Sequence, residues 1–167
     1  MIVVGLGKAG CNVAKAFSKF PQYETYGIDT TKEADITIKE RKSHEDYDAN
    51  FPSLKKKLKF KDEDVLVVTA GAGSISGGVL RLLEQIKNNS VRVLYIEGDL
   101  SIMSETQKKQ ERVVSCVLQE YARSGILQQI IMVSNAHLER TIGDMSIIGY
   151  YDTLNQAIVN IVHMLNV

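Results

Sequence analysis

The sequence predicts an α/β protein with a Rossmann-like three-layer αβα architecture around a mostly parallel sheet. Three observations predict this class. Apolar residues switch repeatedly between a strand period and a helix period along the chain. Two β-branched apolar runs each lead directly into a glycine-rich turn and then into a helical pattern. The length of 167 residues suits one domain with a substantial core, so residues 1–167 are expected to form a single domain.

The first half of the chain is expected to hold four strands and three helices. Short apolar runs predict the strands, and apolar residues at helical spacing predict the helices. Pro21 ends the first helix, and Leu54 and Leu58 are expected to face inward from the second. The polar stretch 39–50 has no apolar period and is expected to be a loop. The expected strands are 2–4, 25–28, 36–38 and 65–69, and the expected helices are 12–20, 52–60 and 79–86.

The second half is expected to add two strands, 91–96 and 126–133, and two long helices, 103–121 and 145–165. The apolar residues of the first of these helices are expected to face inward, namely Val113, Val114, Val117, Leu118 and Tyr121. Strands that alternate with helices build a parallel sheet, and ligands of such sheets bind beyond the carboxyl ends of the strands. Both glycine-rich turns are expected to lie at those ends.

Composition excludes several classes of function. Lys plus Arg equals Asp plus Glu, 20 against 20, so no overall field attracts nucleic acid or an anionic membrane. The apolar runs are far shorter than a membrane span, and the start of the chain does not read as a secretory signal. The two cysteines lack the spacing of a disulfide framework or a zinc site, and the three histidines lack ligand spacing. A cytoplasmic protein without a metal site of its own is expected.

The first glycine-rich turn, Gly5-Leu6-Gly7-Lys8-Ala9-Gly10, matches the GxGxxG pattern between a strand and a helix. In a dinucleotide-binding fold, an acidic residue at the end of the next strand holds the ribose, and Asp29 stands at that place. Taken alone, this turn favours an NAD-binding domain. The alternative is purely structural, because glycines let a strand turn tightly into a helix.

The second glycine-rich turn, Gly71-Ala72-Gly73-Ser74-Ile75-Ser76-Gly77-Gly78, follows the clearest buried-strand pattern of the chain. An NAD fold has no need of such a turn. Small residues let backbone amides approach an anion, and Ser74 and Ser76 can donate to phosphate oxygens or cap the helix. The structural alternative is a flexible loop with Ser76 as a plain N-cap. Neither turn ends in the GK[ST] of a P-loop. Together the turns predict a nucleotide with several phosphates, held from two sides.

Five segments in register carry a family resemblance: Gly5 to Asn12, Ile28-Asp29-Thr30, Thr69 to Gly77, Ser134-Asn135-Ala136, and the pair Tyr151 and Asn155. Their order and spacing resemble the N-terminal GTP-binding domain of the tubulin/FtsZ family. The resemblance extends from Met1 to the chain end, which would fall within the central helix of that family.

The resemblance implies a guanine-nucleotide-binding protein, related to cytoskeletal filaments, that takes GTP or GDP, with Mg²⁺ possible through the phosphates. It implies that 7–11 and 73–78 hold the phosphates, and that Asn12, Asn135, Tyr151 and Asn155 hold the base. The full set of implied nucleotide-binding residues is Gly7, Lys8, Ala9, Gly10, Cys11, Asn12, Asp29, Ala70, Gly71, Gly73, Ser74, Ile75, Ser76, Gly77, Gly78, Glu105, Asn135, Tyr151 and Asn155.

The chain also departs from the family pattern. Lys8 and Ala9 replace family glycines, and Ile75 places a bulky β-branched side chain in the signature loop. The ribose-binding Glu of the family aligns at about Met103, and Glu105 stands where the family has an Arg. Ala136 replaces the family's Asp after Asn135. The catalytic loop of the family follows the central helix, beyond the last residue of this sequence. The resemblance implies a GTPase, but no catalytic residue is expected within this sequence, so the sequence does not support hydrolysis by this chain alone.

Two other functions remain open at this point. An NAD(P)-binding Rossmann domain would use Gly5, Gly7, Gly10 and Asp29. A nucleotide-free interaction module would have kept the fold and lost the ligand. The expected partners are a guanine nucleotide and, at an exposed face of the last helix, a second copy or another protein; no nucleic acid and no membrane are expected. That face comprises Ile158, Ile161, Val162 and Leu165.

Overall fold

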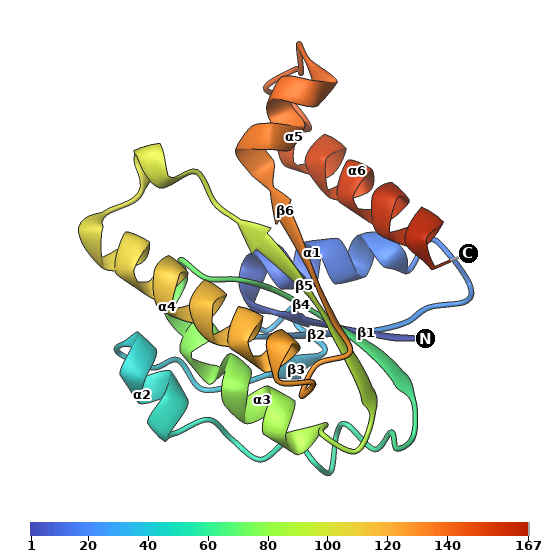
Figure 1. Ribbon diagram of the computed structural model, residues 1–167, viewed down its shortest axis with the longest axis vertical. Helices are drawn as coiled ribbons and strands as arrows, with labels where there is room; N and C mark the ends of the chain where they lie inside the picture. Colours follow the sequence, from blue (N-terminus) through green and yellow to red (C-terminus); the bar gives the residue numbers. More distant parts are fainter. Residues whose placement is uncertain (167) are drawn as a thin grey trace.

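The computed structural model describes residues 1–166 and contains one six-stranded sheet that is parallel throughout (Figure 1). The strand order is β3-β2-β1-β4-β5-β6. This arrangement confirms the predicted α/β, Rossmann-like class. The strands are β1 (Ile2–Leu6), β2 (Glu24–Asp29), β3 (Ile36–Thr37), β4 (Asp64–Ala70), β5 (Ser90–Glu97) and β6 (Gln129–Ser134).

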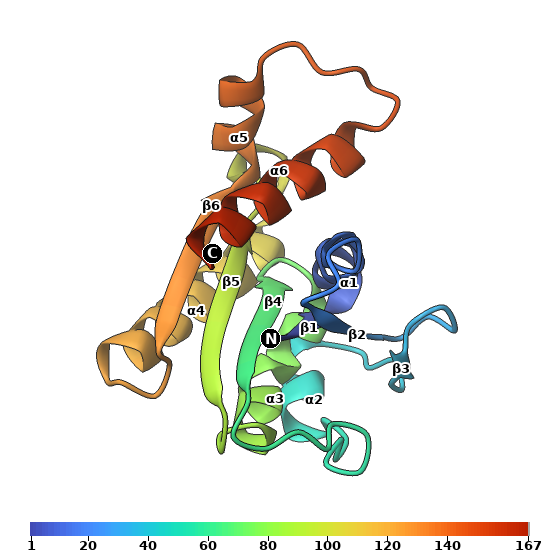
Figure 2. The same cartoon turned by 90° about the vertical axis from the view of Figure 1, so that its right-hand side faces the viewer.

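Helices cover both faces of the sheet (Figures 1 and 2). Helices α1 and α6 pack on one face, and α2, α3 and α4 pack on the other. Two short 3₁₀ helices, η1 and η2, follow β4 and β5. The helices are α1 (Gly7–Phe17), α2 (His44–Ala49), η1 (Ser74–Gly78), α3 (Val79–Gln85), η2 (Leu100–Ile102), α4 (Glu105–Arg123), α5 (Asn135–Ile142) and α6 (Tyr150–Leu165).

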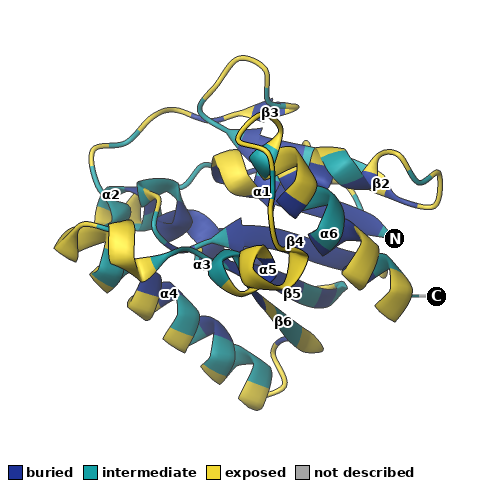
Figure 3. Ribbon diagram, turned by 90° about the horizontal axis from the view of Figure 1, so that it is seen from above, coloured by how far each residue is buried: buried dark blue, intermediate teal, exposed yellow. Residues whose placement is uncertain are grey.

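The central strands are buried on both faces because their side chains alternate between the two cores. In β4, Val65 and Val67 join the core under α3 and α4, while Leu66 and Val68 join the core under α1 and α6. A strand buried on both sides must be apolar at every position, which is why its sequence is a continuous apolar run. Figure 3 shows these strands as a dark layer between helices whose outer faces are exposed.

Two predictions for the stretch after β3 are wrong. The expected loop 39–50 contains helix α2, which Ser43 caps by accepting from the N–H of Asp46 at 3.2 Å. The expected helix 52–60 is irregular, although Leu54 and Leu58 are buried as predicted.

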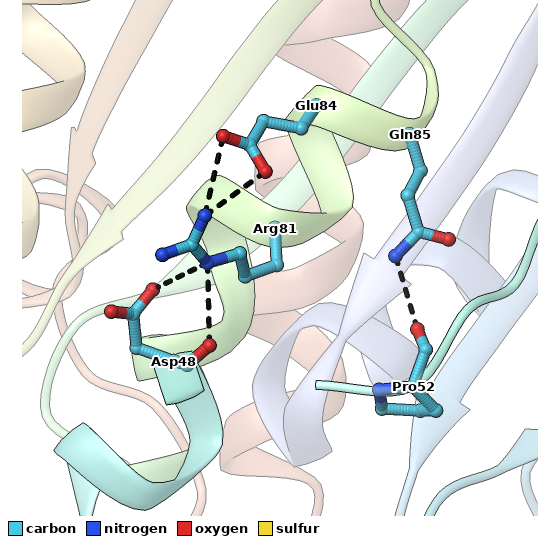
Figure 4. Close-up of polar contacts among 5 residues, drawn as sticks. All are labelled: Asp48, Pro52, Arg81, Glu84 and Gln85. Carbon is cyan, nitrogen blue, oxygen red and sulfur yellow. Dashed lines mark hydrogen bonds and ion pairs between the residues drawn. The ribbon is translucent and has the colours of Figure 1, made fainter. Parts of the chain in front are cut away.

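In the irregular stretch 52–60, backbone polar groups form hydrogen bonds with a side chain of α3. Gln85 Nε2 donates to the carbonyl of Pro52 at 3.0 Å (Figure 4), and Gln85 Oε1 accepts from the N–H of Leu54 at 2.5 Å. Beside it, Arg81 Nε donates to Asp48 Oδ1 at 3.0 Å and joins α3 to α2.

The long helices also differ from their predictions in detail. Helix α6 begins at Tyr150 instead of 145, because Gly149 has a φ of +80° and residues 143–149 form a loop that extends beyond the sheet (Figure 1). In α4, Val114 and Leu118 are buried as predicted, but Val113 is exposed.

The prediction that four apolar residues of α6 form an exposed face is wrong for two of them. Ile158 and Val162 are both 0% exposed, because they pack with α1 and the sheet. Ile161 and Leu165 are exposed as expected. The helix thus turns only part of its apolar surface outward. Among residues 1–166, no helix is long and apolar enough to cross a membrane.

Candidate nucleotide site

The two glycine-rich turns lie side by side at the carboxyl edge of the sheet. The first follows β1 and the second follows β4, and these strands are hydrogen-bonded neighbours, with Gly5 paired to Val68. From β1 the chain continues to β2 and β3 on one side, and from β4 it continues to β5 and β6 on the other. Parallel sheets bind ligands at such a switch point. The expected position of both turns is confirmed.

Glycines of the first turn allow α1 to approach the sheet closely. A Cβ on Gly5 would lie 2.3 Å from the carbonyl oxygen of Gly10, and one on Gly10 would lie 2.4 Å from that of Val68. Gly7 has a φ of +73°, which favours glycine. The close approach of α1 to the sheet and the backbone conformation of Gly7 require these glycines without any ligand. The structural alternative stated above therefore suffices for this part of the GxGxxG pattern.

The N-terminus of α1 is nevertheless open to an anion. Lys8 and Ala9 are exposed in its first turn, which carries no acidic residue. Within the part of the chain that the structure describes, no side chain caps this end of the helix. The first N–H groups of an uncapped helix, with a lysine beside them, attract negative charge.

Cys11, Asn12 and Asp29 line a cavity of about 530 Å³ between α1 and β2, together with Lys8. The Cys11 thiol donates to the carbonyl of Ile28 at 3.5 Å, and burial raises its pKa to about 12. A thiol in this state is not a nucleophile at neutral pH. Asp29 Oδ1 accepts from the N–H of Thr30 at 2.8 Å.

Glycines of the second turn are also fixed by packing. A Cβ on Gly71 would lie 2.1 Å from Tyr95 Oη, one on Gly77 would lie 1.9 Å from the carbonyl oxygen of His44, and one on Gly78 would lie 2.2 Å from the Phe51 ring. Gly73 is different, because its surroundings leave room for a side chain. Ala70 is the last residue of β4, and Ser74 is the first residue of η1.

The hydroxyl of Ser76 shapes the second turn from inside. Ser76 is buried, and its Oγ donates to the carbonyl oxygens of Gly71 at 2.8 Å and Gly73 at 2.6 Å. Ile75 lies beside it, and its side chain faces the first turn: a Cβ on Gly7 would be 2.7 Å from Ile75 Cγ2.

Asn135 and Tyr151 come together in a second cavity, of about 290 Å³, at the carboxyl ends of β5 and β6. Asn135 begins α5, and its Oδ1 is buried without a hydrogen-bond partner among residues 1–166. Tyr151 is the second residue of α6 and is 68% exposed at the cavity. Its ring packs edge-on against Tyr150, with ring centres 5.1 Å apart.

Other predicted site residues lie outside this second cavity. Asn155 is half-buried one turn further along α6, and Asn12 lines the cavity of Asp29. Glu105 lies exposed at the start of α4, where it accepts from Lys108 Nζ at 2.8 Å. The structure therefore places most of the predicted residues in the two turns and in two cavities, whereas Glu105 and Asn155 lie outside these groups.

Sequence reasoning missed Glu111 of α4. This residue is only 6% exposed, and neither carboxylate oxygen finds a hydrogen-bond partner in the described part of the chain. It lies under the second turn, since a Cβ on Gly71 would be 2.9 Å from Glu111 Oε2. Burial raises the pKa of its carboxyl. A signal existed in the sequence, because Glu111 shares the helical stripe of the buried Val114 and Leu118.

The strand order and the turns behind β1 and β4 define a Rossmann-like α/β domain. Its fold is similar to that of tubulin/FtsZ-like proteins of known structure. CetZ from Methanosaeta thermophila strain DSM 6194 matches with a TM-score of 0.73 and 16% identity, over 98% of this chain and 53% of that chain. An empty FtsZ dimer from M. jannaschii matches with a TM-score of 0.71 and 14% identity, over 96% and 52%.

This chain thus spans about half the length of each of these two proteins. At such identities the likeness establishes the fold. No family model matches the sequence, and no curated protein matches it.

Proposed function

We propose that this protein binds a guanine nucleotide across the carboxyl edge of its sheet, with GTP and GDP as the first ligands to test. The observation that carries the proposal is the unpartnered, buried Oδ1 of Asn135 beside the exposed ring of Tyr151. A buried amide oxygen needs a donor. Guanine offers N–H donors on one edge and a flat face for the tyrosine, so it satisfies both residues at once.

The phosphate end of the nucleotide would lie at α1. The uncapped N-terminus of this helix and the exposed Lys8 supply N–H donors and positive charge. Mg²⁺ would be held through the phosphate oxygens, which are among its usual ligands. Residues 1–166 contain no group of three His, Cys, Asp or Glu side chains suited to hold a metal. We thus propose that Asn135 and Tyr151 hold the base and that the N-terminus of α1 with Lys8 holds the first phosphate. No hydrolytic residue is proposed.

Base recognition is tested by titrating the protein with GMP, GDP, GTP, ATP and NADH in a calorimeter. We expect guanine nucleotides to bind at least about tenfold more tightly than ATP or NADH, because adenine lacks the N1–H and 2-amino donors. Asn135→Ala should weaken guanine binding by about tenfold or more. Asn160→Ala is the matched control, since Asn160 is exposed on the outer side of α6. Equal affinity for ATP, or an unaffected Asn135→Ala variant, would contradict the proposal.

A dinucleotide is the second candidate, favoured by the cavity of about 530 Å³ that Asp29 lines next to Lys8 and Asn12. An acid at the end of β2 is where a dinucleotide fold binds ribose. In this case NADH fluorescence should rise on adding protein, and Asp29→Asn should reduce the rise. Absence of any NADH signal at millimolar protein excludes this candidate.

We also propose that the protein acts in the cytoplasm in a filament-related role. The support is the tubulin/FtsZ-like fold and the solved FtsZ dimer that shares it. Sedimentation of the purified protein with and without GTP tests the role. A protein that stays in the supernatant at every concentration, with and without nucleotide, does not form filaments by itself.

A further inference from the structure

We infer that Ile75 limits how many phosphates the site holds, because its side chain lies in the gap between the two glycine-rich turns. The inference rests on the proposed guanine-nucleotide site. Ile75 Cγ2 would be 2.7 Å from a Cβ on Gly7 and 4.0 Å from a Cβ on Gly73. The Cγ2 methyl group of Ile75 therefore lies against the start of α1, although Ile75 itself is part of the second turn.

Ile75 is fixed in this position. Its side chain is half-buried and packs against the core under α2, α3 and α4. The backbone before and after it is held, because Ser76 Oγ donates to the carbonyl of Gly73 at 2.6 Å and Gly77 packs on the backbone of His44. A β-branched side chain also has few rotamers. The methyl group will not readily move aside for a ligand.

A methyl group in this gap changes which phosphates can be bound. A phosphate held from both turns needs N–H donors on both sides at hydrogen-bond distance. Ile75 puts an apolar group there, which removes water from the phosphate oxygens without donating to them. The N-terminus of α1 remains open, so one phosphate can bind there. A second and a third phosphate would add little to the binding affinity. The site as built is therefore suited to a guanosine monophosphate.

The test compares GMP, GDP and GTP by calorimetry on four proteins: the wild type, Ile75→Val, Ile75→Ala and Ile75→Gly. For the wild type we expect GMP and GTP affinities within about threefold of each other. Ile75→Ala and Ile75→Gly should bind GTP at least about tenfold more tightly than the wild type, with GMP affinity changed less than about twofold, because only the gap has opened. Ile75→Val keeps the γ methyl group that faces Gly7 and should behave like the wild type.

Two controls separate the possible outcomes. Leu83→Ala loosens the same core from α3, five residues beyond the second turn, and should leave the GTP-to-GMP ratio unchanged. Circular dichroism and urea unfolding check that each variant folds; if Ile75→Gly does not, Ile75→Ala decides the matter, since alanine keeps the Cβ and costs less chain entropy.

The titrations distinguish failure of the inference about Ile75 from failure of the proposed guanine-nucleotide binding. If the wild type binds guanine nucleotides but the GTP-to-GMP ratio is the same in Ile75→Ala and Ile75→Gly, Ile75 does not limit the phosphates and the proposed function stands. A wild type that already binds GTP more than tenfold more tightly than GMP also overturns the inference alone. If no guanine ligand binds any of the four proteins, both are overturned.

Discussion

Glycines of the second turn differ in how much space surrounds them, and therefore in whether alanine could replace them. Gly77 lies against the carbonyl of His44, at the point where α2 packs on η1. Gly73 is exposed and has space for a Cβ. The same sequence motif therefore combines a glycine that holds two helices together with one whose small size serves no internal contact.

Gly77→Ala should destabilise the protein by about 1–3 kcal/mol, since the new methyl group collides with backbone and α2 must shift. Gly73→Ala should change the free energy of unfolding by less than about 0.5 kcal/mol. Urea unfolding followed by circular dichroism measures both. If Gly73→Ala proves as costly as Gly77→Ala, the close packing of Gly77 is not the cause.

Glu111 makes stability depend on pH. Burial raises the pKa of this carboxyl above its ordinary value of 4.5, so the folded protein binds the proton more tightly than the unfolded chain does. Its favourable contribution is complete below pH 4.5 and is lost as the pH rises through the folded pKa. At neutral pH, the buried carboxylate should destabilise the fold.

Glu111→Gln should therefore be more stable than the wild type at pH 7, and the difference should shrink as the pH falls toward 4.5. Unfolding midpoints in urea at several pH values provide the measurement. Glu120→Gln, on the exposed side of the same helix, removes an ion pair with Arg123 and is the control for the loss of a surface carboxylate. A difference that stays constant across this pH range would mean that Glu111 does not titrate there.

At the residue scale, sequence spacing predicted which segments meet at the carboxyl edge but not which atoms remain free there. Ser76 was expected to serve as a phosphate donor or an N-cap, and in the structure its hydroxyl donates to carbonyls of its own turn. The position of Ile75 between the turns depends on how two separate loops pack. Such information is tertiary, and no local pattern contains it.

Helix α6 shows the same limit at the scale of an element. Its sequence is apolar on much of its surface, so periodicity could not tell which stripe faces the core. Tertiary packing selects Ile158 and Val162, which are fully buried, and leaves Ile161 37% exposed. The segment 52–60 was mistaken for a helix because Leu54 and Leu58 have helical spacing, whereas a side chain of α3 holds its backbone in an irregular path.

Ile158→Ala should lower the free energy of unfolding by about 2–5 kcal/mol, because it leaves a cavity between α6 and the sheet. Ile161→Ala, one turn away and partly in solvent, should cost under about 1 kcal/mol. Thermal and urea unfolding of the pair give the comparison. Equal losses would mean that the outer stripe of α6 is covered in solution, as the sequence-based expectation of a partner on this helix would require.

At the scale of the whole molecule, the alternation of strand and helix patterns was sufficient for the fold class. The buried strands β1, β4 and β5 were each predicted within a few residues, because continuous β-branched runs have few other interpretations. The order of the strands is not a local property of the sequence. The sequence therefore predicted a mostly parallel sheet without a strand order, and the two solved structures share the fold that this order produces.

The strand order has a consequence for the nascent chain. β1 is synthesised before the other strands of this sheet, yet it lies between β2 and β4 in the interior of the sheet. Residues 24–29 soon pair with one edge of β1, whereas the other edge stays open until residues 64–70 have been made. An open strand edge can pair with another chain, and contacts distant in the sequence form slowly. During the interval between these two events the unpaired edge of β1 would favour aggregation, and a chaperone that covers this edge would protect the nascent chain.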